Sequence, residues 1–186
     1  MKYSRTVDDK TRSLLIEFIL NCPSSIKKGN KCYPVSARKC SFKQRGIHDS
    51  LLRTILAQIK KELPNRKCYV KVRSGESVEN AIKQINNECN LSDTEHEYII
   101  LTEHHAMSEA ESVYYYIRNA FAHGSFNVGI SKDNSRIYSL ESRKENVIKS
   151  RMLLKETTLE AYITLMKKSP DNIKEYQRKK KTLVYR

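Results

Sequence analysis

The chain has 186 residues, of which 39% are hydrophobic and 30% are charged, a composition typical of one folded domain with a sizeable core. Its formal net charge of +14 favours an anionic partner. No apolar stretch is long enough to span a bilayer or resembles a secretory leader, so we expect a cytoplasmic protein without a membrane partner. The five cysteines form no Cys-x-x-Cys pair, and no zinc-site spacing is present, so we expect reduced thiols and neither a metal nor another cofactor.

The excess positive charge lies at the two ends of the chain. Residues 1–46 carry eleven basic and three acidic side chains, and residues 167–186 carry eight and two, so the segment between them is neutral. These ends are either solvating arms or attractors of nucleic acid through counterion displacement. In the second interpretation, Lys179, Lys180 and Lys181 are candidate RNA-binding residues.

The first half of the chain contains three segments with helical spacing of apolar residues. These predicted helices cover Asp8–Asn21, Asp49–Leu63 and Glu76–Cys89. Between the first two lies a basic segment, about residues 22–47, which we predict to be a loop because Pro and Gly interrupt it. Residues 68–73 alternate weakly and suit either a short strand or an extended loop.

The second half contains a further ambiguous segment and two clear patterns. Residues 93–105 suit a helix or a buried strand, and we favour a helix beside other helices. Alternating apolar residues around Asp133-Asn134 predict a small β-hairpin over about residues 125–141. A last long helix is predicted for Val147–Lys168.

These elements predict a mainly α fold. We expect a single domain over residues 1–170, built as an antiparallel bundle of about four to six helices, with the small β-hairpin between the last two. Residues 171–186 would form a basic C-terminal tail beyond the packed body.

The most informative stretch is the predicted helix at about residues 108–123. Ser108 and Glu111 have the spacing of a capping box, in which each side chain accepts a free N–H of the first turn. Gly124 can adopt the left-handed conformation that ends a helix. An apolar stripe runs along one face and consists of Val113, Ile117, Ala120 and Phe121.

Three polar residues near the end of this helix are candidates for catalysis: Arg118, Asn119 and His123. Asn119 and His123 are four residues apart, so their side chains can meet. Arg118 and His123 are five apart and point about 140° away from each other on a straight helix. Either the helix breaks before His123, or a second copy of the chain supplies the missing partner.

The residues Arg118-Asn119-Ala120-Phe121-Ala122-His123 resemble the signature of the HEPN superfamily (higher eukaryotes and prokaryotes nucleotide-binding domain), in which an Arg and a polar residue precede a His. The resemblance covers about Ser108–Lys168. It implies a helical bundle that forms a homodimer with a composite active site. It also implies a metal-independent ribonuclease of a toxin or phage-defence system, controlled by a separate antitoxin or sensor protein.

Such an enzyme needs a proton carrier and a stable positive charge. Imidazole side chains titrate near neutral pH, so His123 suits general acid–base chemistry, while the guanidinium of Arg118 matches phosphate oxygens. Asn119 would orient the imidazole. Tyr114 and Tyr115 could stack on RNA bases, although consecutive residues spread around a helix and at least one of these tyrosines should belong to the core or a dimer surface.

Other interpretations of the same residues remain open. An Arg, an Asn and a His at the end of a helix also serve as ordinary C-terminal caps. The chain could instead be a non-catalytic module that binds RNA or a nucleotide, or a structural adaptor held together by this helix.

Overall fold

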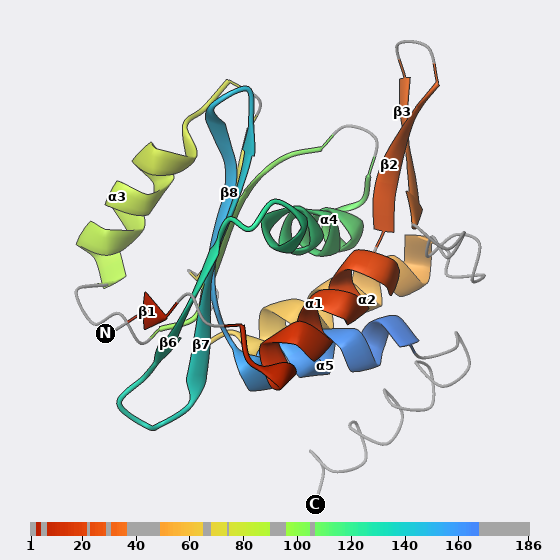
Figure 1. Cartoon of the computed structure of the whole chain (residues 1–186). Helices are drawn as coiled ribbons and strands as arrows, with labels where there is room; N and C mark the ends of the chain where they lie inside the picture. Colours follow the sequence, from red (N-terminus) through yellow and green to blue (C-terminus); the bar gives the residue numbers. More distant parts are fainter. Residues whose placement is uncertain are drawn as a thin grey trace, which may run out of the picture.

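The computed structural model describes residues 3–4, 7–21, 23–28, 31–36, 49–64, 68–73, 75–89, 96–104 and 107–167 (Figure 1). Within these ranges the chain forms five α-helices: α1 (Asp9–Asn21), α2 (Asp49–Glu62), α3 (Val78–Cys89), α4 (Glu109–Ala122) and α5 (Glu156–Lys167). The same ranges contain eight β-strands: β1 (Tyr3–Ser4), β2 (Pro23–Lys28), β3 (Lys31–Ser36), β4 (Tyr69–Val72), β5 (Tyr98–Thr102), β6 (Phe126–Ile130), β7 (Arg136–Lys144) and β8 (Val147–Lys155).

Six of these strands form one mixed sheet in the order β1–β6–β7–β8–β5–β4, and β2 and β3 pair separately as an antiparallel hairpin. The neighbours β4 and β5 are parallel, whereas the other neighbouring strands of the sheet are antiparallel. A parallel pair requires a crossover connection, and α3 supplies it. The strand β8 lies in the interior of the sheet, between β7 and β5.

The two faces of the sheet are covered differently (Figure 1). The helices α1, α2, α4 and α5 lie on one face, where they and the sheet enclose the main hydrophobic core. On the other face, α3 packs against β4, β5 and β8 and encloses a smaller core, which consists of Val72, Val78, Ala81, Ile85, Ile100 and Ile148. Among the described elements, no helix covers β6 and β7 on the α3 side.

The predicted fold class is wrong. The mixed sheet makes this an α/β fold instead of a mainly helical bundle: α4 and α5 pack on one face of the sheet, and α1 and α2 pack on α4 and α5. Several local predictions are nevertheless confirmed to within a few residues. They are the helices α1, α2, α3 and α4, the strand option for residues 68–73, and the hairpin of β6 and β7.

Residues 93–105 contain the strand β5 instead of the predicted helix. Ile99, Ile100 and Leu101 are all fully buried, Ile99 and Leu101 in the main core and Ile100 in the core under α3. A strand that is buried on both faces reads as a continuous apolar run, so alternation gives no signal.

The predicted long helix at Val147–Lys168 is wrong in its first half, which forms β8, and only Glu156–Lys167 is helical. The strand packs on both faces, with Met152 and Leu154 in the main core and Ile148 under α3. A register shift beside Ser142 and Arg143 of β7 interrupts the alternation. The resulting spacing of apolar residues imitates a helix.

The predicted basic loop at about residues 22–47 contains the hairpin β2–β3, and residues 37–48 lie outside the described ranges. The predicted tail at residues 171–186, with Lys179, Lys180 and Lys181, also lies outside them. Within the described residues, no helix is long and apolar enough to cross a membrane.

The helix α1 begins with a charged cap that ties it to the sheet. Asp8 Oδ1 accepts a hydrogen bond from the Thr11 backbone N–H at 2.9 Å, and Asp8 Oδ2 pairs with Arg136 of β7. The bond from Thr11 and the contact with Arg136 lower the pKa of the Asp8 carboxyl from 3.8 to about 2. A carboxyl whose pKa is depressed in the folded state stabilises the fold above its unfolded pKa, and this contribution disappears as the pH falls through about 2.

We therefore expect Asp8→Asn to lower stability at pH 6, with a difference from wild type that shrinks as the pH falls from about 4 to 2. Asn keeps the cap but cannot titrate or pair with Arg136 as an anion. Urea midpoints at several pH values would measure the difference. Asp9→Asn removes the same charge from the adjacent position and serves as the control. A difference for Asp8→Asn that does not depend on pH would contradict this assignment.

Candidate functional site

The candidate residues lie on α4, whose first turn is closed by the predicted capping box. Glu111 N–H donates to Ser108 Oγ at 3.3 Å, and Glu111 Oε2 accepts from the Ser108 N–H at 3.0 Å. The apolar stripe of this helix is buried as predicted: Val113, Ile117, Ala120 and Phe121 are each at most 3% exposed. The capping box and the apolar stripe therefore fix both the start of α4 and the face that it turns to the core.

The end of α4 is a Schellman motif centred on Gly124. Gly124 has φ +65°, its N–H donates to Phe121 O at 3.1 Å, and the Ser125 N–H donates to Ala120 O at 2.8 Å. This confirms the predicted left-handed glycine. Because the chain turns sharply here, His123 is the last residue before it leaves the helix for β6.

Arg118 is half-buried, and only part of its guanidinium has a partner. Its Nη1 donates to Asn119 Oδ1 at 3.2 Å. Its Nε is buried and has no hydrogen-bond partner among the described residues. A buried N–H without a partner costs free energy comparable to a lost hydrogen bond. The guanidinium therefore retains hydrogen-bonding capacity that the described part of one chain does not satisfy.

His123 is exposed at the C-cap of α4, where its backbone N–H donates to Asn119 O at 3.0 Å. No hydrogen bond joins the side chains of Asn119 and His123 in the part of the chain that the structure describes. The Asn119 amide oxygen instead accepts from Arg118. The structure therefore connects Arg118 to Asn119 and leaves the imidazole of His123 open to solvent.

The tyrosines of α4 are differently placed. Tyr114 is fully buried, and its hydroxyl donates to Tyr162 O at 2.8 Å, so its ring has no free surface for an RNA base. Tyr115 is half-buried, with its ring 5.2 Å from the rings of both His104 and Tyr116. Tyr116 is buried, which raises the pKa of its hydroxyl, and it donates to Thr102 O at 3.0 Å. Only Tyr115 retains an accessible surface.

The described residues that could hold a metal are not gathered in one place. Within the described ranges, no three His, Cys, Asp or Glu side chains are arranged to bind an ion. Arg118 and Asn119 offer hydrogen-bond donors to an anion, and the exposed imidazole of His123 can transfer protons.

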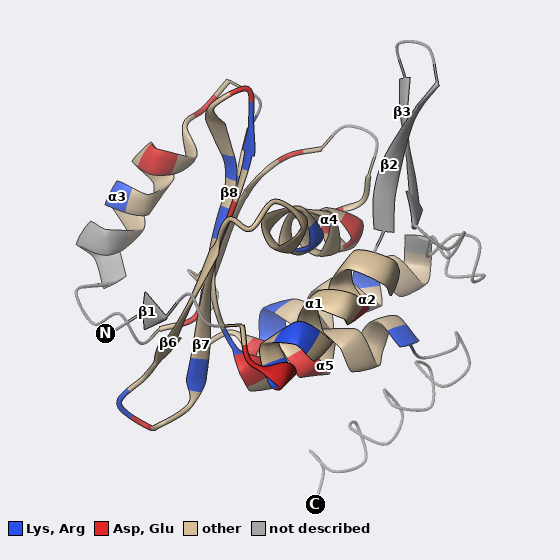
Figure 2. Cartoon of the chain, in the orientation of Figure 1, with Lys and Arg blue, Asp and Glu red and all other residues tan. Residues whose placement is uncertain are grey.

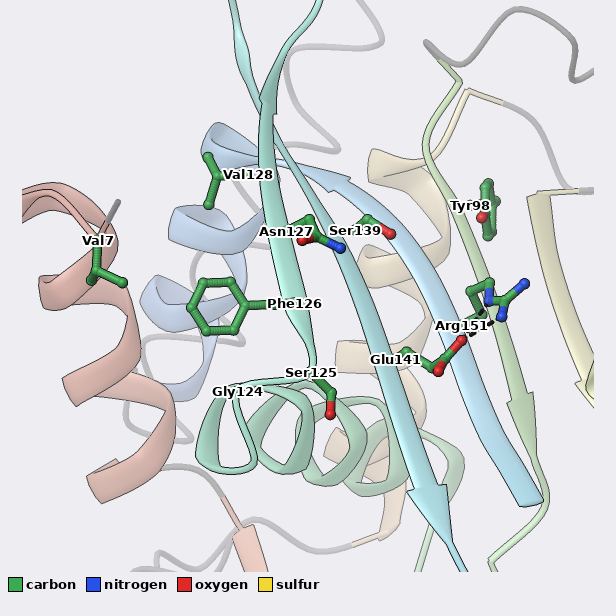
Figure 3. A pocket seen from close by; sticks show the side chains of 10 residues that line it. All are labelled: Val7, Tyr98, Gly124, Ser125, Phe126, Asn127, Val128, Ser139, Glu141 and Arg151. Carbon is green, nitrogen blue, oxygen red and sulfur yellow. Dashed lines mark hydrogen bonds and ion pairs between the residues drawn. The ribbon is translucent and has the colours of Figure 1, made fainter. Parts of the chain in front are cut away.

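A cavity of about 800 Å³ lies beside the end of α4 (Figure 3). Gly124 and Ser125, which follow His123 directly, line one end of it. The other lining residues come from β5, β6, β7, β8 and the segment before α1, and they are Val7, Tyr98, Phe126, Asn127, Val128, Ser139, Glu141 and Arg151. Sequence reasoning missed this cavity.

The sequence feature that could have indicated this cavity is the alternation of polar residues along β7, where Ser139, Glu141 and Arg143 occupy every second position. These residues lie on the face opposite to Tyr138 and Leu140, which belong to the main core. Two further polar residues of the cavity, Asn127 and Arg151, come from the neighbouring strands β6 and β8. Only the pairing of these strands with β7 brings them next to Ser139 and Glu141.

No model of a known protein family matches the chain, and neither the curated proteins nor the solved structures contain a significant match. The likeness to the HEPN superfamily therefore rests on the sequence of residues 108–168 alone.

The end of α4 can be tested through Gly124. We expect Gly124→Ala to destabilise the protein by about 1 kcal/mol, because an L-residue in the left-handed region is strained. No atom lies within 4 Å of the position that a Cβ would occupy, so steric overlap adds nothing. Gly124→Asn should cost less, because Asn tolerates this conformation better. Chemical unfolding would measure both variants, and an Ala variant as stable as wild type would contradict the assignment.

Proposed function

We propose that the chain is a metal-independent endoribonuclease whose active site contains Arg118, Asn119 and His123. The observation that carries the proposal is the pairing of two features at the end of α4. The Arg118 guanidinium has a buried N–H without a partner in the described residues, and the His123 imidazole is exposed five residues later. An incompletely satisfied cation and an accessible proton carrier at the end of one helix suit a phosphodiester substrate that a second copy of the chain helps to bind.

In this mechanism the 2′-hydroxyl of the RNA attacks the adjacent phosphorus. An imidazole removes the proton of the 2′-hydroxyl, the P–O5′ bond breaks, and a protonated imidazole returns a proton to the 5′-oxygen. The products are a 2′,3′-cyclic phosphate and a 5′-hydroxyl. The guanidinium of Arg118 stabilises the negative charge that develops on the phosphate oxygens.

Among the described residues, one copy of the chain supplies one imidazole at the end of α4. We propose that two copies of α4 face each other across a two-fold axis, so that two His123 residues divide the roles of base and acid.

The wider setting of the proposal comes from the HEPN resemblance. A toxin or phage-defence effector with a separate antitoxin or sensor protein fits a small ribonuclease. The basic hairpin segment, which contains Lys27, Lys28 and Lys31, has its strand β2 beside α4 and supports an RNA partner (Figure 1).

A second candidate function is a module that binds RNA without cutting it. The observation in its favour is the hydrogen bond from Arg118 to Asn119, because an amide held in this way does not orient the imidazole. A non-catalytic module needs the cations near α4 but not a correctly oriented histidine.

Substitution of the catalytic residues separates these two functions. We expect His123→Ala to reduce RNA cleavage by at least about 100-fold, the usual scale of general acid–base catalysis, while RNA affinity stays near wild type. Arg118→Lys keeps the charge but loses the planar fork, so cleavage should also fall. Asn119→Ala should have a milder effect, and a metal chelator should have none. Gel assays of labelled RNA would measure cleavage and binding.

His96 provides the matched control, because it is an exposed histidine outside α4. His96→Ala should cleave like wild type. Equal cleavage by wild type and His123→Ala would show that the activity lies elsewhere. If wild type binds RNA tightly but never cuts it, the binding module replaces the enzyme.

The composite site makes a separate prediction about assembly. We expect the protein to sediment as a dimer at micromolar concentration, and the specific activity to fall on dilution as the dimer dissociates. Analytical ultracentrifugation and dilution kinetics would measure both quantities. Cleavage by a protein that remains monomeric would contradict the composite site without contradicting the role of His123.

A further inference from the structure

The cavity beside the end of α4 has a polar floor made of two rows that run across the strands (Figure 3). In the first row, Glu141 of β7 is the direct neighbour of Arg151 of β8, and its N–H donates to Ser125 O at 2.9 Å. In the second row, Ser139 of β7 is paired with Asn127 of β6. Successive residues on one face of a strand are about 7 Å apart, so this distance separates the two rows.

In the first row Glu141 holds the guanidinium of Arg151. Glu141 also pairs with Arg143, which lies two residues further along β7 and does not line the cavity. Glu141 Oε2 accepts a hydrogen bond from Arg151 Nε at 3.0 Å, and Glu141 Oε1 accepts from Arg143 Nε at 2.5 Å. Partial burial acts to raise the pKa of the Glu141 carboxyl, but the bonds from Arg151 and Arg143 outweigh it, so the pKa is lowered. Glu141 therefore stays ionised and orients both guanidiniums.

The cluster keeps an excess of N–H donors. The hydroxyl of Ser77 and, more weakly, the charges of Arg151 and Arg143 lower the pKa of the nearby Glu79 carboxyl of α3. With Glu79 the charges of the cluster balance, but each guanidinium has five N–H groups. Glu141 occupies Nε and one terminal nitrogen of Arg151, and only Nε of Arg143. Figure 2 shows that further basic residues colour β8, while the Arg151 side chain is still 32% exposed. The terminal N–H groups of Arg151 that Glu141 does not use can donate to a phosphate group.

The second row offers neutral hydrogen-bonding groups. Ser139 has a hydroxyl, and Asn127 carries an exposed amide that has no hydrogen-bond partner in the described ranges. Hydroxyls and amides both donate and accept, as the hydroxyl groups of a sugar do. The cavity therefore presents a phosphate-binding end and, about 7 Å away, a sugar-binding end.

We propose that this cavity binds a phosphorylated sugar, with the phosphate on Arg151 and the sugar hydroxyls on Ser139 and Asn127. A volume of about 800 Å³ accommodates such a ligand. The required chemistry is shared by free sugar phosphates and by nucleotides, which carry the same group. The site uses neither Arg118 nor the imidazole of His123, so ligand binding in the cavity can be tested independently of RNA cleavage.

Titration calorimetry on the full-length protein tests the proposal with four probes: ribose 5-phosphate, adenosine monophosphate, inorganic phosphate and ribose. We expect ribose 5-phosphate to bind more tightly than inorganic phosphate or ribose alone. Adenosine monophosphate distinguishes between the two classes of ligand. If it binds more tightly than ribose 5-phosphate, the site is assigned to nucleotides; if it binds more weakly, the site is assigned to free sugar phosphates.

Two variants examine the two ends of the cavity separately. Arg151→Gln should weaken ribose 5-phosphate at least about tenfold, the loss expected for a charged hydrogen bond. Asn127→Ala should weaken ribose 5-phosphate but leave inorganic phosphate unchanged, and its exposed side chain makes no contact on which folding depends. Arg53→Gln removes the same charge from an exposed position of α2, in the other layer, and should change nothing.

Three results would overturn the proposal. They are no binding of ribose 5-phosphate or adenosine monophosphate, equal binding of inorganic phosphate and ribose 5-phosphate, and equal affinities of wild type and Asn127→Ala for ribose 5-phosphate. The last comparison remains decisive if Arg151→Gln fails to fold.

Discussion

The position of the candidate site depends on how the end of α4 is anchored in the core. The Phe121 ring lies 5.6 Å from Phe18 of α1, 5.3 Å from Phe126 of β6 and 6.2 Å from Tyr138 of β7. Burial of one such side chain contributes about 1.5–3 kcal/mol, and aromatic contacts add to this. One ring thus joins the helix that carries Arg118 and His123 to another helix and to two strands of the sheet.

This anchoring makes the two sides of the sheet unequal. Four helices gather around the aromatic cluster on one face, while α3 covers only β4, β5 and β8 on the other. On that face Ser139 and Glu141 of β7 are half-buried beside the cavity and belong to neither core, whereas Ile137 on the same face is fully buried. The cavity with Glu141 and Arg151 is a consequence of this unequal coverage.

The end of α4 therefore lies at the boundary between two chemically different surfaces. Arg118 and His123 lie on the helix before Gly124, and the lining of the polar cavity begins at Gly124 itself. The sharp turn at Gly124 carries the chain from the helical layer into the sheet. The proposed cleavage site and the proposed phosphate site are consequently neighbours in sequence but use different residues and different elements.

The sequence by itself determined the features that depend on near neighbours in the chain. The capping box of Ser108 and Glu111, the stop at Gly124 and the buried stripe of α4 all follow from contacts within a few residues, and the structure confirms them. The placement of Arg118, Asn119 and His123 at the end of that helix was equally predictable; their catalytic role stays a prediction.

Only the tertiary structure decided the fold class and the cavity, because both depend on pairing between distant segments. The strands Tyr98–Thr102 and Val147–Lys155 are buried on both faces between neighbouring strands. Their sequences therefore lack the alternation of apolar and polar residues that marks a strand. The turn between β7 and β8 is formed by Glu145 and Asn146, both with positive φ, and lacks the glycine that usually signals such a turn. Glu141 and Arg151 are ten residues apart in the chain, and only the pairing of these strands places them side by side.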